Sequence, residues 1–211
     1  MSMNSIAFAL LIAAGVFAAG NWIAVAREHV LGMYVCKPLT LVLMIGAAAA
    51  LDPRSSSTRG WFVVALMLSL AGDVFLMLPT DAFVAGLSAF LLAHVAYVVG
   101  INQSSAGDWV LAIPVIAVAM LMGTRLVRGI RDQGQPRLVP PVVAYVLTIL
   151  VMVSSAVASG NAVMAVGAVS FMVSDALIGE HRFVRKRPWQ PVSIMVTYHL
   201  AQALLVVSLT T

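Results

Sequence analysis

Eight apolar stretches, each about long enough to cross a bilayer, follow one another along the chain. Inside the hydrocarbon, every backbone amide must be hydrogen-bonded within the protein, and a helix does this within its own segment. The pattern therefore predicts an all-α, polytopic transmembrane bundle of eight helices, with residues 1–211 as a single integral membrane domain. The stretches lie near 5–26, 35–51, 61–79, 83–101, 109–127, 138–158, 161–179 and 192–210.

The composition agrees with a membrane protein and excludes several other classes. Charged residues make up 9% of the chain, whereas a soluble domain carries roughly 25%. The formal net charge is +4, but no basic patch is interleaved with aromatic residues, so no nucleic-acid partner is expected. Cys36 is the single cysteine, which excludes an internal disulfide and a metal site built from cysteines.

The basic residues are unevenly distributed among the connections between stretches. The connections after odd-numbered stretches hold most of them, whereas those after even-numbered stretches hold Arg54 and Arg59. The positive-inside rule therefore places the odd connections in the cytoplasm and both termini outside. The expected location is a bacterial inner (cell) membrane. The first stretch is expected to be a retained helix, because no Lys or Arg precedes it as in a signal peptide.

Two aspartates interrupt the apolar pattern: Asp73 in "SLAGDVFLML" and Asp175 in "SFMVSDALIG". A carboxylate in hydrocarbon costs several kcal/mol unless it is compensated, so intramembrane acids are functional candidates by default. Each is followed by a histidine in the next stretch, His94 and His199 respectively. This weak similarity between the two halves of the chain is compatible with two parallel four-helix repeats.

The rise of about 1.5 Å per residue gives the depth of each acid. Asp73 is expected about 9 Å, and Asp175 about 6 Å, from the cytoplasmic ends of their helices. Lys37 is expected in the first turn of the second helix, on the same side of the membrane. Tyr198 lies about 10 Å into the last helix. This shared depth predicts one polar cavity open toward the cytoplasmic leaflet.

Structural explanations remain open for several of these side chains. Lys37 could pair with an acid, or its long side chain could extend to the membrane surface. The two histidines could be interior histidines with satisfied hydrogen bonds, and Tyr97, Tyr198 and Gln202 could be polar contacts between helices.

Two nearby carboxyl groups rarely ionise together, so one can act as an acid while the other acts as a base. Glycosidases use such a pair to protonate a leaving group, stabilise an oxocarbenium-like cation and activate water. An acid-labile lipid ether could be cleaved in the same way, without a metal or an organic cofactor. The chain contains no G-x-S-x-G, H-E-x-x-H or glycine-rich phosphate-loop motif.

Five segments occur in an order typical of a known family: "KPLT", "LAGDVFLML", "FVAGLSAFLLAHVAY", "GAVSFMVSDALI" and "YHLAQ". The chain resembles the lysoplasmalogenase family of YhhN-like integral membrane hydrolases over most of its length. The resemblance implies a hydrolase that cleaves the vinyl ether of lysoplasmalogens to a fatty aldehyde and a glycerophospho-base. One departure is His199, where the family pattern often has a second tyrosine.

The resemblance also implies roles for individual residues. Asp73 and Asp175 are the catalytic acid and base, in an order that stays open, and no metal or cofactor is expected. Lys37, with arginines of the cytoplasmic connections, meets the substrate phosphate. The ligand is a lysophospholipid-type amphiphile that enters from the membrane, and the oligomeric state stays open. The residues expected to line the pocket are His94, Tyr97, Ser174, Tyr198, His199 and Gln202.

Two other functions fit the same residues. Paired acids with histidines also build proton relays, so a proton-coupled transporter of a small molecule or lipid is one alternative. The other is a metal-dependent intramembrane lipid hydrolase that uses Asp73, His94, Asp175 and His199 as ligands.

Overall fold

The computed structural model describes residues 4–80, 82–103 and 107–211, and this part of the chain contains eight long α-helices and no strand. All eight are long and apolar enough to cross a membrane, which confirms the predicted all-α transmembrane architecture. Three short 3₁₀ segments accompany them: η1 (Trp109–Ala112) precedes α5, η2 (Pro136–Leu138) precedes α6, and η3 (Ser208–Thr210) follows α8. The helices are α1 (Ser5–Ala26), α2 (Val30–Ala50), α3 (Ser56–Met77), α4 (Phe83–Ile101), α5 (Ile113–Asp132), α6 (Val139–Ala158), α7 (Ala162–Phe183) and α8 (Gln190–Val207).

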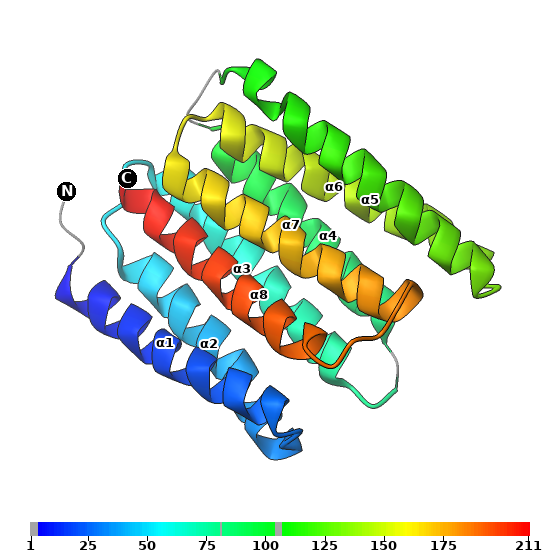
Figure 1. The fold of residues 1–211 in the computed structure, drawn as a ribbon. Coiled ribbons are helices and arrows are strands. Elements are labelled where there is room, and N and C mark those ends of the chain that lie inside the picture. The colour runs from blue at the N-terminus through cyan, green and yellow to red at the C-terminus, as the bar shows by residue number, and fades with distance from the viewer. Residues whose placement is uncertain (1–3, 81, 104–106) are drawn as a thin grey trace.

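The helices run roughly along one direction, and helices consecutive in the chain alternate up and down (Figure 1). The pair α1–α2 lies on one side of the bundle and α5–α6 on the other, with α3, α4, α7 and α8 between them. The most extensive contacts join α3 to α4, α1 to α2 and α7 to α8. The short connection at residues 159–161 makes α6 and α7 antiparallel neighbours.

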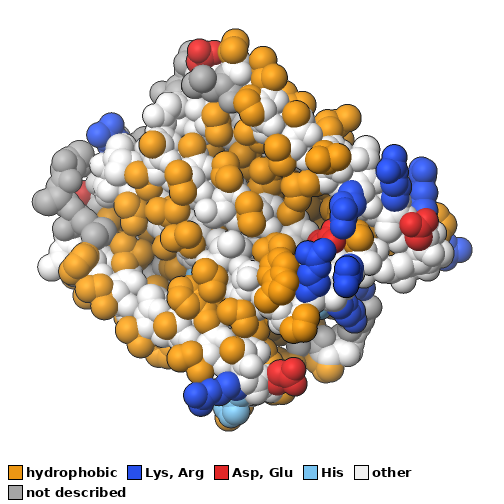
Figure 2. All heavy atoms as spheres, in the orientation of Figure 1, with side chains coloured by type: hydrophobic (Ala, Val, Ile, Leu, Met, Phe, Trp, Pro, Cys, Tyr) orange, Lys and Arg blue, Asp and Glu red, His pale blue; other side chains and the backbone are white. Residues whose placement is uncertain are grey.

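Charge separates the two ends of the bundle. We define the basic end as the one with the connections at 27–29, 133–138 and 184–189. Figure 2 shows Lys and Arg side chains gathered at this end, while hydrophobic side chains cover the flank between the ends. Arg54 and Arg59 lie at the opposite end, where α1 begins and α8 ends. The basic residues at or near the basic end are Arg27, Arg125, Arg128, Arg131, Arg137, Arg182, Arg185, Lys186 and Arg187.

The start of α2 differs from the prediction. The helix begins at Val30 rather than near residue 35, because the His29 ring accepts a hydrogen bond of 3.0 Å from the Gly32 amide and caps the first turn. The prediction that Lys37 lies in the first turn is therefore wrong, since Lys37 lies about 10 Å along the helix. Hydropathy marks where a helix becomes apolar, whereas a capping side chain decides where it begins.

The end of α7 also lies further along the chain than expected. The helix continues to Phe183 rather than ending near residue 179, and Arg125 on α5 donates two hydrogen bonds of 2.8 Å to Glu180 in its last turn. Asp175 therefore lies about 12 Å from its helix end rather than 6 Å. Asp73 lies about 6 Å from the end of α3 rather than 9 Å. Both acids remain in the half of the bundle nearer the basic end.

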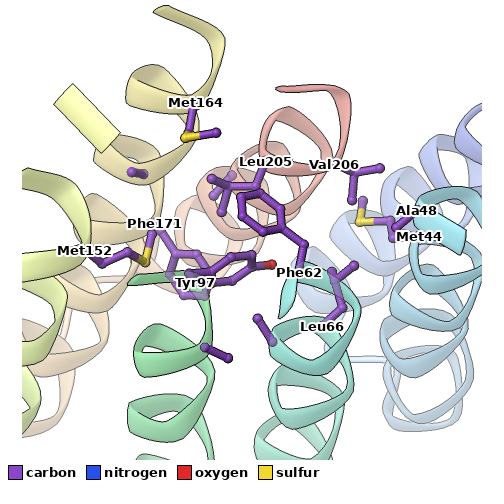
Figure 3. Packing of buried hydrophobic residues seen from close by; sticks show 14 of the residues in the cluster. Met44, Ala48, Phe62, Leu66, Tyr97, Met152, Met164, Phe171, Leu205 and Val206 are labelled. Atoms are coloured by element: carbon purple, nitrogen blue, oxygen red, sulfur yellow. The ribbon is translucent and has the colours of Figure 1, made fainter. Parts of the chain in front are cut away.

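Aromatic rings fill the centre of the bundle. Figure 3 shows Phe62, Tyr97 and Phe171 among aliphatic and methionine side chains. The rings of Phe62 and Tyr97 pack edge to face at 5.0 Å. Close approach of α3 and α4 requires Gly72, because a Cβ there would lie 2.6 Å from the ring of Phe90. This glycine directly precedes Asp73 and brings that part of α3 against α4.

Candidate functional site

Asp73 on α3 is buried and has both of its oxygens engaged. Lys37 Nζ on α2 lies 3.0 Å from Oδ1, and the Tyr198 hydroxyl on α8 donates a 2.8 Å hydrogen bond to Oδ2. Asp73 is 1% exposed. Burying a charge in this way is tolerable when an opposite charge and hydrogen bonds compensate it. Three helices are thus joined through one carboxyl group.

Asp175 on α7 has a different environment. The Tyr145 hydroxyl on α6 donates a 2.7 Å hydrogen bond to Oδ2, and His94 Nε2 on α4 lies 3.6 Å from the same oxygen. The histidine contact is too long for a hydrogen bond. Among the residues that the structure describes, Oδ1 has no partner. Asp175 therefore has one oxygen held in place and one available.

An apolar cavity adjoins Asp175. Helices α3 to α7 surround it, and it contains about 740 Å³ of space not filled by atoms, including its open side. The part of this space that a water-sized sphere can occupy is about 70 Å³, so the cavity is narrow. Asp175 and Tyr145 are the polar side chains on its wall. The other lining residues are Leu76, Phe83, Leu87, Phe90, Ala119, Met122, Leu126, Val142, Val146, Ile149, Met172, Ala176, Ile178, Gly179 and Phe183.

The prediction of a polar cavity is therefore wrong for this space. Several polar residues at that depth bind one another across helix interfaces instead of lining the cavity. Asp73, Lys37 and Tyr198 do not belong to its wall. Depth along a helix predicts which residues share a level of the bilayer, but not which direction each side chain takes around the helix.

The two acids are linked through an aromatic ring and do not contact each other directly. No hydrogen bond or ion pair joins them among the described residues. The ring of Phe171, one turn before Asp175, packs 4.7 Å from the His94 ring and 5.5 Å from the Tyr198 ring. Phe171 thus contacts one partner of each acid, and an aromatic contact connects the two polar groups.

The remaining predicted residues form contacts between helices. Tyr97 donates a 2.5 Å hydrogen bond to Gln202 Oε1, and both residues are fully buried. His199 Nδ1 accepts a 3.0 Å hydrogen bond from Trp22 Nε1 on α1. Ser174 donates to the Ile194 carbonyl at 3.1 Å, so its hydroxyl faces α8. None of these side chains lies on the cavity wall.

Each acid is held by helices of the other half of the chain as well as its own. Asp73 on α3 is bound from α2 and α8, and Asp175 on α7 is approached from α6 and α4. The two sets correspond when each helix is replaced by the equivalent one in the other half of the chain: α3 by α7, α2 by α6 and α8 by α4. Tyr97 and Gln202, which bond each other, each lie three residues after a histidine of the predicted repeat. This crossed pattern agrees with two parallel repeats.

Tyr145 is the contact to Asp175 that the predicted site lacked. The sequence marks it as a polar residue inside an apolar stretch, but no motif links it to the acid 30 residues later. Apart from the size of its side chain, nothing in the sequence indicates that Phe90 lines the cavity. The four side chains considered as metal ligands do not form one cluster, because His94 lies beside Asp175 whereas Asp73 and His199 have other partners. No set of three His, Cys, Asp or Glu residues within the described ranges is arranged to hold a metal ion.

Comparison with known proteins places the chain in a family. The model of the YhhN family matches residues 32–209, which include both aspartates and all their partners. The chain belongs to the YhhN family. This membership confirms the resemblance found in the sequence and agrees with the eight-helix architecture.

Several relatives of this YhhN family member are known. A protein of Mycobacterium bovis named lysoplasmalogenase is 33% identical over 173 residues, covering 79% of this chain and 66% of that relative. Human lysoplasmalogenase TMEM86B is 32% identical over 172 residues, covering 82% of this chain and 73% of the human protein. The mouse protein of the same name is 34% identical over 191 residues, covering 89% and 79%. No solved structure matches the chain.

Proposed function

We propose that this protein is a lysoplasmalogenase, a membrane hydrolase that cleaves the vinyl ether of an alkenyl glycerophosphocholine or glycerophosphoethanolamine. The observation that carries the proposal is the position of Asp175, an acid with one available oxygen on the wall of an apolar cavity. The apolar wall suits the hydrocarbon chain of a single-chain lipid, and the carboxyl group supplies the proton that the reaction requires. The names of the relatives support the same activity.

In the proposed reaction, Asp175 gives its proton to the β-carbon of the vinyl ether, and the double bond's electrons form the new C–H bond. The α-carbon becomes an oxocarbenium ion, and Asp175 becomes a carboxylate. Water attacks the α-carbon, and its proton passes to a carboxylate. The hemiacetal then collapses to a fatty aldehyde and the free glycerol hydroxyl. One water is consumed, and no redox partner is needed.

Asp73 is the second carboxyl of the proposed pair. Both of its oxygens are engaged, and it does not line the cavity, so Asp175 is assigned as the acid that meets the substrate. From this position Asp73 acts through its neighbours, since Tyr198 packs against Phe171, which contacts the His94 ring beside Asp175. The aromatic ring of Phe90 on the cavity wall adds a face that favours a nearby cation.

The test is to incubate the detergent-purified protein with a panel of lysoplasmalogens and to measure aldehyde release, with and without EDTA. Asp175→Asn and Asp73→Asn are each expected to lower kcat at least about 100-fold. Asp52→Asn is the matched control, because Asp52 is exposed at the opposite end of the bundle. Full activity in Asp175→Asn would exclude the proposed acid, and loss of activity in EDTA would favour the metal-dependent alternative.

We infer that the basic end faces the cytoplasm of a bacterial cell membrane and that both termini face outward. The experiment replaces Cys36 by Ser and introduces one cysteine, at Gln133 or at Asn102. A membrane-impermeant maleimide applied to intact cells is expected to label the cysteine at 102 and not the one at 133. The opposite labelling pattern would show that the basic end faces outward.

A further inference from the structure

A groove on the outer surface of the bundle lies between α5 and α6, the helix pair at one side of the fold (Figure 1). It contains about 830 Å³ of space not filled by atoms, including its open side. A water-sized sphere can occupy about 340 Å³ of the groove, against about 70 Å³ of the cavity beside Asp175. The groove is therefore the wider of the two spaces.

The groove and the cavity share part of their walls. Ala119 on α5, with Val142 and Val146 on α6, lines both spaces. Met120 and Leu147 line the groove but not the cavity, and both are exposed on the flank of the bundle, where the bilayer lies. A single layer of apolar side chains thus separates a space that faces lipid from the space that contains the acid.

Two arginines line the end of the groove nearer the basic end. Arg128 and Arg131 are three residues apart on α5, so they share a face of the helix. Both are exposed, and neither side chain has a hydrogen bond or ion pair with any residue that the structure describes. From Arg131 to Ala119 the groove runs about 18 Å along α5. It therefore spans roughly one leaflet, since the hydrocarbon core is about 30 Å thick.

The two sides of α5 are held differently. On the α7 side, Arg125 donates two hydrogen bonds of 2.8 Å to Glu180. On the α6 side, no side-chain hydrogen bond or ion pair joins residues 113–132 to residues 139–158, and apolar groups such as Val146 make the contact. Apolar side chains can exchange protein contacts for lipid contacts at little cost. Separation of α5 from α6 is therefore less costly than separation of α5 from α7.

We propose that the groove between α5 and α6 is the docking site from which a single-chain phosphodiester amphiphile passes from the leaflet at the basic end into the cavity. This inference rests on the proposed function for the identity of the ligand. The phosphate lies at Arg128 and Arg131, whose guanidinium groups suit its oxygens. The chain lies along the groove over Ala119. The narrow cavity behind that wall admits one chain, which selects a lysolipid over a two-chain phospholipid.

A cross-link over the groove tests this route. Gly123→Cys and Val146→Cys are introduced together with Cys36→Ser, because a Cβ at Gly123 would lie 3.4 Å from Val146 Cγ1, close enough for a disulfide. Oxidation in membranes is expected to slow aldehyde release from a lysoplasmenylcholine at least about tenfold, since α5 can no longer separate from α6. A reductant is expected to restore the rate. Full activity of the oxidised protein, with the disulfide verified by mass spectrometry, would overturn the proposal.

The matched control is a disulfide on the other side of the bundle. Gly20→Cys alone is sufficient, because a Cβ at Gly20 would lie 3.3 Å from the Sγ atom of Cys36. This bond joins α1 to α2, away from the groove (Figure 1). Oxidation of this variant is expected to leave the rate of aldehyde release unchanged. An equal loss in both cross-linked proteins would mean that the α5–α6 contact has no special role, and would overturn the proposal.

The head-group end of the groove has its own test, with two substrates that share an alkenyl chain. These are a lysoplasmenylcholine and an alkenylglycerol that lacks the phosphate. Arg128→Gln and Arg131→Gln together are expected to raise KM for the first substrate about tenfold, because charge-assisted contacts are lost, and to leave the second unchanged. Lys186→Gln is the control, since Lys186 is exposed at the same end but does not line the groove. An unchanged KM, or an equal rise for both substrates, would contradict the phosphate contact.

Photolabelling separates the docking site from the proposed activity. The probe is a non-cleavable alkyl lysophosphocholine with a photoreactive group in its chain, added to the protein in phosphatidylcholine vesicles. Met120 and Val143, which line the groove but not the cavity, are expected to be labelled. Labelling in a protein that releases no aldehyde would support the docking site and reject the hydrolase. Aldehyde release without labelling of the groove would do the reverse.

Competition identifies the occupant of the groove. Unlabelled alkyl lysophosphocholine is expected to displace the probe, whereas a two-chain phosphatidylglycerol at the same mole fraction is not. Equal displacement by both lipids would show that the groove takes any phospholipid of the bilayer, and would overturn its assignment to a single-chain ligand.

Discussion

Lys37 Nζ lies 3.0 Å from Asp73 Oδ1, and this ion pair joins α2 to α3 within the membrane-spanning part of the bundle. Neither charge is compensated by water, since Asp73 is 1% and Lys37 8% exposed. Their mutual attraction and the hydrogen bond from Tyr198 offset the loss of hydration. The pair is therefore sensitive to the removal of either partner.

Lys37→Met is expected to lower the free energy of unfolding by about 3–5 kcal/mol, because it leaves a buried carboxylate without its cation. Lys37→Met combined with Asp73→Asn is expected to recover most of this loss. Unfolding in mixed detergent, followed by circular dichroism, measures both variants. A double variant as unstable as the single one would show that Lys37 acts through packing of its stem rather than through the ion pair.

Tyr145→Phe tests whether the hydroxyl that holds Asp175 positions the acid. The variant is expected to lower kcat about tenfold, with KM nearly unchanged, because the carboxyl loses one hydrogen bond and its fixed orientation. Tyr34→Phe is the control, since the Tyr34 hydroxyl donates to the Met77 carbonyl, away from the cavity. A rise in KM alone would indicate that Tyr145 contacts the substrate and does not position Asp175.

The architecture, and the half of the bundle that holds the two acids, were predictable. Hydropathy identifies all eight spans, because the bilayer imposes a minimum length on each helix. The helical rise places both Asp73 and Asp175 in the half of the bundle nearer the basic end, although their distances from the helix ends differ from those predicted. The helix ends were less predictable. His29 caps α2, and Glu180 in the last turn of α7 pairs with Arg125, and both depend on polar residues outside the apolar windows.

The partners of each acid were not predictable from depth. His94 is the histidine that follows Asp73 in the chain, yet it lies beside Asp175, while Tyr198 of the last helix binds Asp73. Rotation about the helix axis and the order of helices around the bundle decide these contacts. A single sequence in which most residues are apolar constrains neither. The contacts of each acid with helices from the other half of the chain are therefore seen only in the structure.

The Tyr97–Gln202 hydrogen bond joins α4 of the first half of the chain to α8 of the second half, and its contribution to stability can be measured. Tyr97→Phe and Gln202→Leu are each expected to destabilise the protein by about 1–2 kcal/mol. The double variant is expected to lose less than the sum of the two, because the single variants leave one partner unpaired. A double-mutant cycle in mixed detergent measures the coupling. Strict additivity would mean that the 2.5 Å contact contributes nothing to stability.

The length of the cavity predicts a limit on the substrate chain. Gly179 packs against Leu126, which sets α5 beside α7. Measured from that contact toward the bilayer centre, Asp175 lies about 6 Å along α7 and Ala119 about 10 Å along α5. Ala119 thus lines the part of the cavity beyond the acid, where the tail of a bound substrate would lie. A larger side chain there should shorten the space for the tail without reaching the acid.

Ala119→Phe is expected to lower kcat/KM for a substrate with a long alkenyl chain by about tenfold, equivalent to losing one or two buried methylene groups of binding, and to leave a short-chain substrate nearly unaffected. Val118→Phe is the control, because Val118 is 47% exposed on the outer face of α5, whereas Ala119 is 3% exposed. Aldehyde release measured over a series of chain lengths tests both variants. An equal loss for every chain length in Ala119→Phe would mean that the tail takes another route out of the site.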